Sequence, residues 1–124
     1  MRKFVIALVM AVSLLPQLAR AEVNLVMAEQ PGCIYCIRWD REIAHIYPKT
    51  AVGKAAPLLR YNIREDAPPV TLANSVRFTP TFILARDGVE IGRLEGYPSE
   101  DFFWGLIERM VVEAGFSVED VGSS

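Results

Sequence analysis

The sequence predicts a single small α/β domain in which about four strands form a mixed sheet flanked by helices. Short apolar runs of strand length alternate with segments whose apolar residues recur at three- and four-residue steps. Two of the strand-like runs are joined through Asp87-Gly88, a pair typical of tight hairpin turns. Residues 22–124, which remain after a leader-like segment, suffice for one hydrophobic core but not for two.

Residues 1–21 have the three parts of a secretory signal peptide. Met1-Arg2-Lys3 is basic, Phe4 to Leu15 is apolar, and Ala19-Arg20-Ala21 has the small residues that precede a cleavage site. The apolar part is shorter than the roughly 20 residues that cross a bilayer as a helix, so an uncleaved membrane anchor is the weaker alternative. We expect cleavage after Ala21 and a periplasmic mature protein, in a compartment where disulfides form and persist.

The expected mature chain is acidic. The leader holds three of the 13 basic residues and none of the 15 acidic ones, which leaves a net charge of −5. Domains that bind nucleic acids usually carry a basic patch or stripe. The charge balance therefore argues against a nucleic-acid partner.

The first half of the domain is expected to contain a strand, a helix and a second strand. The first strand covers Val23 to Ala28, and Gln30-Pro31-Gly32 should end it. A helix should begin at Cys33 and end at Pro48, because apolar residues recur on one of its faces. These residues are Cys36, Trp39, Ile43, Ile46 and Tyr47. Ala56 to Ile63 then form the second strand.

A crossover and a hairpin should follow. Residues 64–78 form the crossover, in which Val70 to Val76 could make one or two helical turns after Pro68-Pro69. Thr81 to Ala85 and Val89 to Gly92 are the two hairpin strands.

The chain should finish with a helix and a flexible tail. Ser99 is a good N-cap, and Gly115 should end the helix. Its apolar stripe is Phe103, Leu106, Ile107, Met110 and Val111. Residues 117–124 are polar and acidic, without such a stripe, and should form the tail.

Cys33 and Cys36, the only two cysteines, are the candidate functional residues. A zinc site needs three or four protein ligands, and the chain adds only His45 to the two thiols. Haem attachment needs a histidine directly after the second cysteine, where Ile37 stands. A structural disulfide across so short a loop would stabilise the fold little. The pair therefore predicts a reversible dithiol that uses neither a metal nor a cofactor.

The spacing of the two cysteines suits thiol-disulfide exchange. At the start of a helix, free backbone N–H groups and the helix dipole stabilise the thiolate of Cys33, which makes Cys33 the attacking thiol. Cys36 lies three residues further along the same helical face, where it can resolve a mixed disulfide formed at Cys33.

Three segments carry a resemblance to a known family. They are Pro31-Gly32-Cys33-Ile34-Tyr35-Cys36, Phe78-Thr79-Pro80-Thr81-Phe82 and Gly96-Tyr97. Over residues 23–114 the chain resembles the thioredoxin superfamily, and more narrowly the small periplasmic thioredoxins of sulfur-oxidation (Sox) operons. The resemblance implies a minimal, glutaredoxin-sized thioredoxin-like fold over residues 22–116.

The resemblance also implies further site residues. In this family the proline of the threonine-proline peptide is cis and faces the dithiol, and the residue before it pairs with substrate through its backbone. Thr79 and Pro80 match these positions, and Ile34 and Tyr35 should form a partly exposed substrate-binding rim. The chain departs from the family at Met27, where thioredoxins have a buried acid that serves the resolving thiol. The nearest acid is Glu29.

The expected function is that of a periplasmic thiol-disulfide oxidoreductase, which reduces disulfides or sulfur adducts on exported client proteins. The resemblance implies a membrane-embedded thiol electron donor and a client in the sulfur-oxidation system. Two alternatives stay open. One is a disulfide isomerase, although such enzymes are usually dimers and this chain is expected to be a monomer. The other is a non-catalytic, redox-sensing or regulatory interaction protein.

Overall fold

The computed structural model describes residues 21–116. The expected tail, residues 117–124, and all but the last residue of the expected leader lie outside this range. Within it, four strands form one sheet in the order β2-β1-β3-β4. The strands are β1 (Val23–Glu29), β2 (Leu58–Asn62), β3 (Thr81–Arg86) and β4 (Val89–Glu95). β1 runs parallel to β2 and antiparallel to β3, which in turn pairs antiparallel with β4. The sheet is therefore mixed, as the sequence predicts.

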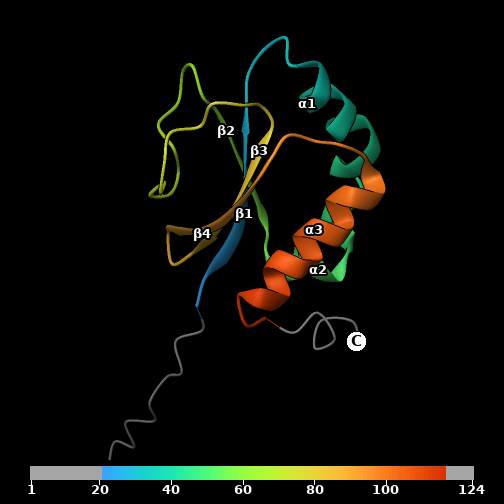
Figure 1. The fold of residues 1–124 in the computed structure, drawn as a ribbon, viewed down its shortest axis with the longest axis vertical. Helices are drawn as coiled ribbons and strands as arrows, with labels where there is room; N and C mark the ends of the chain where they lie inside the picture. Colours follow the sequence, from blue (N-terminus) through green and yellow to red (C-terminus); the bar gives the residue numbers. More distant parts are fainter. Residues whose placement is uncertain (1–20, 117–124) are drawn as a thin grey trace, which may run out of the picture.

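The helices cover one face of this sheet. They are α1 (Ile34–Trp39), α2 (Ala51–Ala55) and α3 (Glu100–Glu113), and Figure 1 shows them together on the right of the sheet. The main core lies between the two layers. Its largest fully buried side chains include Trp39, Tyr47, Phe82 and Phe103, whose rings pack at tilted and edge-to-face angles.

The expected single helix from Cys33 to Pro48 is wrong in its second half. α1 ends at Trp39 and passes into a π-helical turn, Asp40–Ala44, which is followed by a 3₁₀ turn, Tyr47–Lys49. Pro48 lies inside this 3₁₀ turn rather than after a helix, at an early position where its missing N–H costs no hydrogen bond.

The short helix α2 was not predicted. Thr50 caps it, because its hydroxyl accepts a hydrogen bond from the Gly53 N–H at 3.0 Å. Close packing of Gly53 on the carbonyl of Tyr47 places α2 directly beside the 3₁₀ turn. The sequence signal that could have predicted α2 is Thr50, a good N-cap residue that follows shortly after Pro48.

The crossover contains no helix, so the expectation for Val70 to Val76 is wrong. This segment lies against the second face of the sheet, where Val70, Leu72 and Val76 pack on a small cluster of buried residues. These buried residues are Val26, Ala28, Tyr61 and Ile83. Thr71 pairs with Val89 at the open edge of β4, and this backbone pairing replaces helical hydrogen bonds.

Both ends of the final helix agree with the sequence-based expectation. The Ser99 hydroxyl accepts a hydrogen bond from the Phe102 N–H, and Gly115 follows the helix with a φ of +88°. The hairpin is also confirmed, because Asp87 and Gly88 both have positive φ, as a type I′ turn requires.

Candidate active site

Cys33 and Cys36 form a disulfide at the carboxyl end of the central strand β1. Their Cα atoms are 5.2 Å apart. Gly32 precedes them with a φ of +76°, which lets the chain turn sharply from the strand into α1. Cys33 is the N-cap of α1, and its sulfur accepts a hydrogen bond from the Cys36 N–H at 3.2 Å.

The two sulfur-bearing residues differ in accessibility. Cys36 is buried with 5% of its surface exposed, whereas Cys33 is partly exposed. An incoming sulfur atom can therefore reach Cys33 more easily than Cys36. Cys33 also lies where the free N–H groups of the first helical turn favour a negative charge. The arrangement suits attack by Cys33 and resolution by Cys36.

The second part of the candidate site is the loop before β3. The Thr79–Pro80 peptide bond is cis, the isomer that the family resemblance implies. Pro80 is buried, and its carbonyl oxygen accepts a hydrogen bond from the Gly96 N–H at 2.7 Å. The side chain of Gln30, from the cysteine turn, donates a hydrogen bond to the Thr79 hydroxyl at 2.8 Å. Thr79 is thereby joined to the segment that carries the dithiol.

Apolar side chains are exposed around the dithiol. Ile34 is 72% exposed and Tyr35 is 54% exposed, as expected for a rim. Phe78, on the loop before Pro80, is exposed as well. Large apolar groups that protrude singly are ordinary, but three of them on the two segments of one site suit contact with a protein partner.

A hollow of about 250 Å³ lies beside Cys36 and is lined by Glu29, Asp40 and Asn62, among others. Arg60 bridges the two carboxylates, with its Nη2 at 2.5 Å from Glu29 and 2.7 Å from Asp40. Met27 stands where the family resemblance implies a buried acid, and its side chain is fully buried. Two carboxylates that line the hollow are thus paired with one arginine, and of these three residues the sequence analysis names only Glu29.

A polar contact ties the helical segment of the dithiol to the loop before α3. The hydroxyl of Tyr97 donates a hydrogen bond to Glu42, which also pairs with Arg38 at 2.9 Å. The Tyr97 hydroxyl, followed by Arg38, holds the pKa of Glu42 below its ordinary value. Burial, followed by the contact with Glu42, raises the pKa of Tyr97 above its ordinary value.

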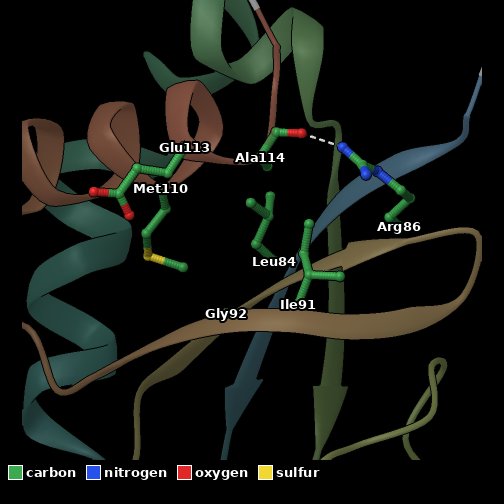
Figure 2. A pocket seen from close by; sticks show the side chains of 7 residues that line it. All are labelled: Leu84, Arg86, Ile91, Gly92, Met110, Glu113 and Ala114. Atoms are coloured by element: carbon green, nitrogen blue, oxygen red, sulfur yellow. Dashed lines mark hydrogen bonds between the residues drawn. The ribbon is translucent and has the colours of Figure 1, made fainter.

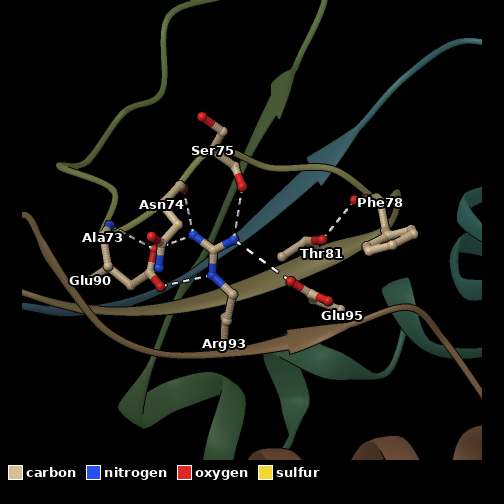
Figure 3. A network of polar contacts seen from close by, with 8 residues as sticks. All are labelled: Ala73, Asn74, Ser75, Phe78, Thr81, Glu90, Arg93 and Glu95. Carbon is tan, nitrogen blue, oxygen red and sulfur yellow. Dashed lines mark hydrogen bonds and ion pairs between the residues drawn. The ribbon is translucent and has the colours of Figure 1, made fainter.

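A larger network fixes the crossover to the sheet (Figure 3). The guanidinium of Arg93 donates to both carboxylate oxygens of Glu90, at 2.6 and 2.8 Å, and to the carbonyls of Asn74 and Ser75. Glu90 in turn accepts a hydrogen bond from the Ala73 N–H. Arg93 lowers the pKa of Glu90 by this hydrogen bonding. The network holds the chain shortly before Phe78 and the Thr79–Pro80 loop.

A second cavity, of about 290 Å³, lies at the other end of the sheet, between β3, β4 and the end of α3 (Figure 2). Arg86, Ile91 and Met110 are among the residues that line it, and Arg86 donates a hydrogen bond to the Ala114 carbonyl. Arg86 pairs with Val23 at the start of β1, whereas the cysteines follow the end of β1. The cavity contains no residue predicted for the site.

Residues 21–116 contain neither a metal-ligand cluster nor a membrane-spanning helix. No three side chains among His, Cys, Asp and Glu in this part of the chain come together as metal ligands would. None of the helices in the same range combines the length and the apolar character that crossing a membrane requires.

The fold and the paired cysteines define the class of thioredoxin-like thiol-disulfide oxidoreductases. A family model described as a thioredoxin-like domain matches residues 17–110, and the chain belongs to this family. Among solved structures, the chain is similar to the periplasmic thioredoxin SoxS from Paracoccus pantotrophus in its reduced form. The sequences are 55% identical, the TM-score is 0.72, and the match covers 75% of this chain and 99% of that chain. A search of curated proteins found no match.

Proposed function

We propose that this protein reduces disulfides or sulfur adducts on exported client proteins, through Cys33 as the attacking thiol and Cys36 as the resolving thiol. The observation that carries the proposal is the asymmetry of the pair. Cys33 is accessible and caps a helix, whereas Cys36 is shielded behind it. The likeness to a periplasmic thioredoxin supports the same chemistry and the same compartment.

The reaction transfers two electrons from the dithiol to the client. The thiolate of Cys33 attacks one sulfur of the client disulfide, and the other client sulfur leaves as a thiolate. Cys36, deprotonated, then attacks the sulfur of Cys33 in the mixed disulfide, which releases the second client thiolate. The Cys33–Cys36 disulfide formed is the oxidised state seen in the structure. A dithiol donor must reduce it before the next turnover.

In this proposal the client sits across Ile34, Tyr35, Thr79 and Pro80. The first two supply exposed apolar surface beside Cys33. The backbone of Thr79 pairs with the client segment that carries the reacting sulfur. Residues 1–21 export the protein to the periplasm and are removed after Ala21. A membrane-embedded thiol protein supplies the electrons, and a protein of the sulfur-oxidation system is the client.

The experiment that tests the proposal is a redox titration of the purified protein in glutathione and dithiothreitol buffers. We expect one reversible two-electron transition near the thioredoxin range, on the order of −270 mV. A reduction potential near −120 mV, typical of strong oxidants, would mean that the protein oxidises its clients rather than reducing them. A chain without any reversible transition would contradict the proposal, and the Cys33→Ser, Cys36→Ser variant provides the baseline.

A second measurement identifies the client. A Cys36→Ala variant cannot resolve its mixed disulfide, so it should retain client proteins covalently when it is exposed to a periplasmic extract. The matched Cys33→Ala variant should retain none. Equal retention by both variants would contradict the assignment of Cys33 as the attacking thiol.

A further inference from the structure

Gln30 contacts three separate segments of the site. Its side-chain oxygen accepts a hydrogen bond from Nε of Arg64, in the crossover, at 2.9 Å. Its side-chain nitrogen donates to the hydroxyl oxygen of Thr79 at 2.8 Å. Its backbone carbonyl accepts a hydrogen bond from the Cys33 N–H at 3.3 Å. Thr79 and Cys33 are therefore both bonded to the same residue.

The chemistry of the three side chains fixes the direction of each hydrogen bond. A guanidinium can only donate, so the amide oxygen of Gln30 must face Arg64 and its NH₂ group must face Thr79. The Thr79 oxygen then accepts, and its own proton is left to donate elsewhere. If the amide were turned round, its oxygen would take the Thr79 proton instead. Arg64 selects between these two states.

We propose that Gln30, held by Arg64, is a positioning residue that keeps the Thr79 hydroxyl proton available to the sulfur of Cys33. The inference rests on the proposed function, in which reduced Cys33 attacks as a thiolate. An anionic sulfur is a far better hydrogen-bond acceptor than the disulfide, so the hydroxyl favours the reduced, reactive state. In the disulfide state the sulfur of Cys33 accepts a hydrogen bond from the Cys36 N–H, and the proposed bond from the Thr79 hydroxyl forms once that sulfur is a thiolate.

The measurement is the pKa of the Cys33 thiol, followed by the ultraviolet absorbance of its thiolate in a Cys36→Ala background with one titrating cysteine. We expect Gln30→Leu to raise this pKa by about one unit, which means about tenfold less thiolate at a pH below it. Arg64→Met should shift it in the same direction, because the amide becomes free to turn. The exposed Arg77, in the same crossover, provides the matched control, and Arg77→Met should leave the pKa unchanged.

A double-mutant cycle shows whether Gln30 acts through Thr79. Thr79→Val keeps the shape and removes the hydroxyl, so it should raise the pKa by itself, whereas Thr79→Ser should preserve the wild-type value. In the Thr79→Val background, Gln30→Leu should have no further effect. An equal shift in both backgrounds would mean that Gln30 acts by packing, and this would overturn the proposal.

The result separates this inference from the proposed function. If the wild-type protein undergoes its redox transition but Gln30→Leu and Arg64→Met leave the pKa of Cys33 unchanged, only the proposed role of Gln30 is wrong. If the wild-type protein has no redox transition, the proposed function itself fails. Thermal unfolding of each variant shows that a changed pKa does not come from a disrupted fold.

Discussion

The hydroxyl of Tyr97 donates a hydrogen bond to the carboxylate of Glu42, and this contact joins two parts of the chain 55 residues apart. Glu42 lies in the π-helical turn that continues α1, and Tyr97 lies in the loop that leads to α3. The neighbouring Gly96 is bonded to the carbonyl of Pro80. The contact therefore helps to fix the helix of the dithiol relative to the Thr79–Pro80 loop.

We expect Tyr97→Phe to destabilise the protein in a manner that depends on pH. The hydroxyl keeps the pKa of Glu42 below its ordinary 4.5, so the stabilisation is present above that value and is lost as the pH falls through the lowered pKa. Urea denaturation should show a gap between wild type and variant at neutral pH that closes in acid. A gap that stays constant across this range would contradict the contribution of Glu42.

We expect Arg93→Met to destabilise the protein by about 3 kcal/mol, the lower end for breaking a buried ion pair, because Arg93 keeps some exposure. The change removes the arginine donor from two crossover carbonyls and from the carboxylate of Glu90, which keeps the hydrogen bond from the Ala73 N–H. The exposed Arg109 of α3 is the control, and Arg109→Met should cost less than about 0.5 kcal/mol. Equal urea midpoints for the two variants would show that the network contributes nothing.

Two glycines in helices should respond to alanine in opposite directions. At Gly53 a Cβ atom would lie 1.7 Å from the carbonyl oxygen of Tyr47, so Gly53→Ala should cost at least about 1–3 kcal/mol through overpacking. At Gly105, inside α3, a Cβ atom would meet nothing within 4 Å. Gly105→Ala should therefore stabilise the protein by about 0.5–1 kcal/mol through helix propensity. Thermal unfolding of both variants checks the sign of each effect.

Tyr47→Phe should lower the free energy of unfolding by about 1–3 kcal/mol. The buried hydroxyl of Tyr47 donates a hydrogen bond to the carbonyl of Ala56 at 2.6 Å, and its removal leaves this carbonyl without a donor. Burial raises the pKa of Tyr47 above its ordinary 10, so its stabilisation is present below pH 10 and is lost as the pH rises further. The difference between wild type and variant should shrink at alkaline pH. The exposed Tyr35 is the control, since Tyr35→Phe should change neither the free energy of unfolding nor its dependence on alkaline pH.

The parts of the fold that the sequence predicts correctly depend on local contacts. The cap at Ser99, the end of α3 before Gly115 and the turn at Asp87-Gly88 involve residues a few positions apart, whose geometry follows from residue type. The change from α1 into a π-helical turn is different, because the side chains after Trp39 contact partners far along the chain. Asp40, for example, pairs with Arg60 of β2.

The same distinction applies to the site. Cys33 and Cys36 are recognisable from spacing alone, because the chemistry itself requires two thiols within one helical turn. Gln30 reads as no more than a strand-ending residue until its partners at positions 64 and 79 are known. The crossover could not be predicted for the same reason, since Thr71 pairs with Val89, a residue of the β3–β4 hairpin that comes later in the chain.

The order of strands in the sheet has a consequence for how the chain folds. β1 comes first along the chain but lies in the middle of the sheet, between β2 and β3. Val23 pairs with Arg86, so the antiparallel neighbour of β1 arrives only after most of the chain has been made. Closing such long loops is slow compared with local helix formation. The contacts within the cysteine turn are local, so we expect them to form before docking of the β3–β4 hairpin positions the Thr79–Pro80 loop.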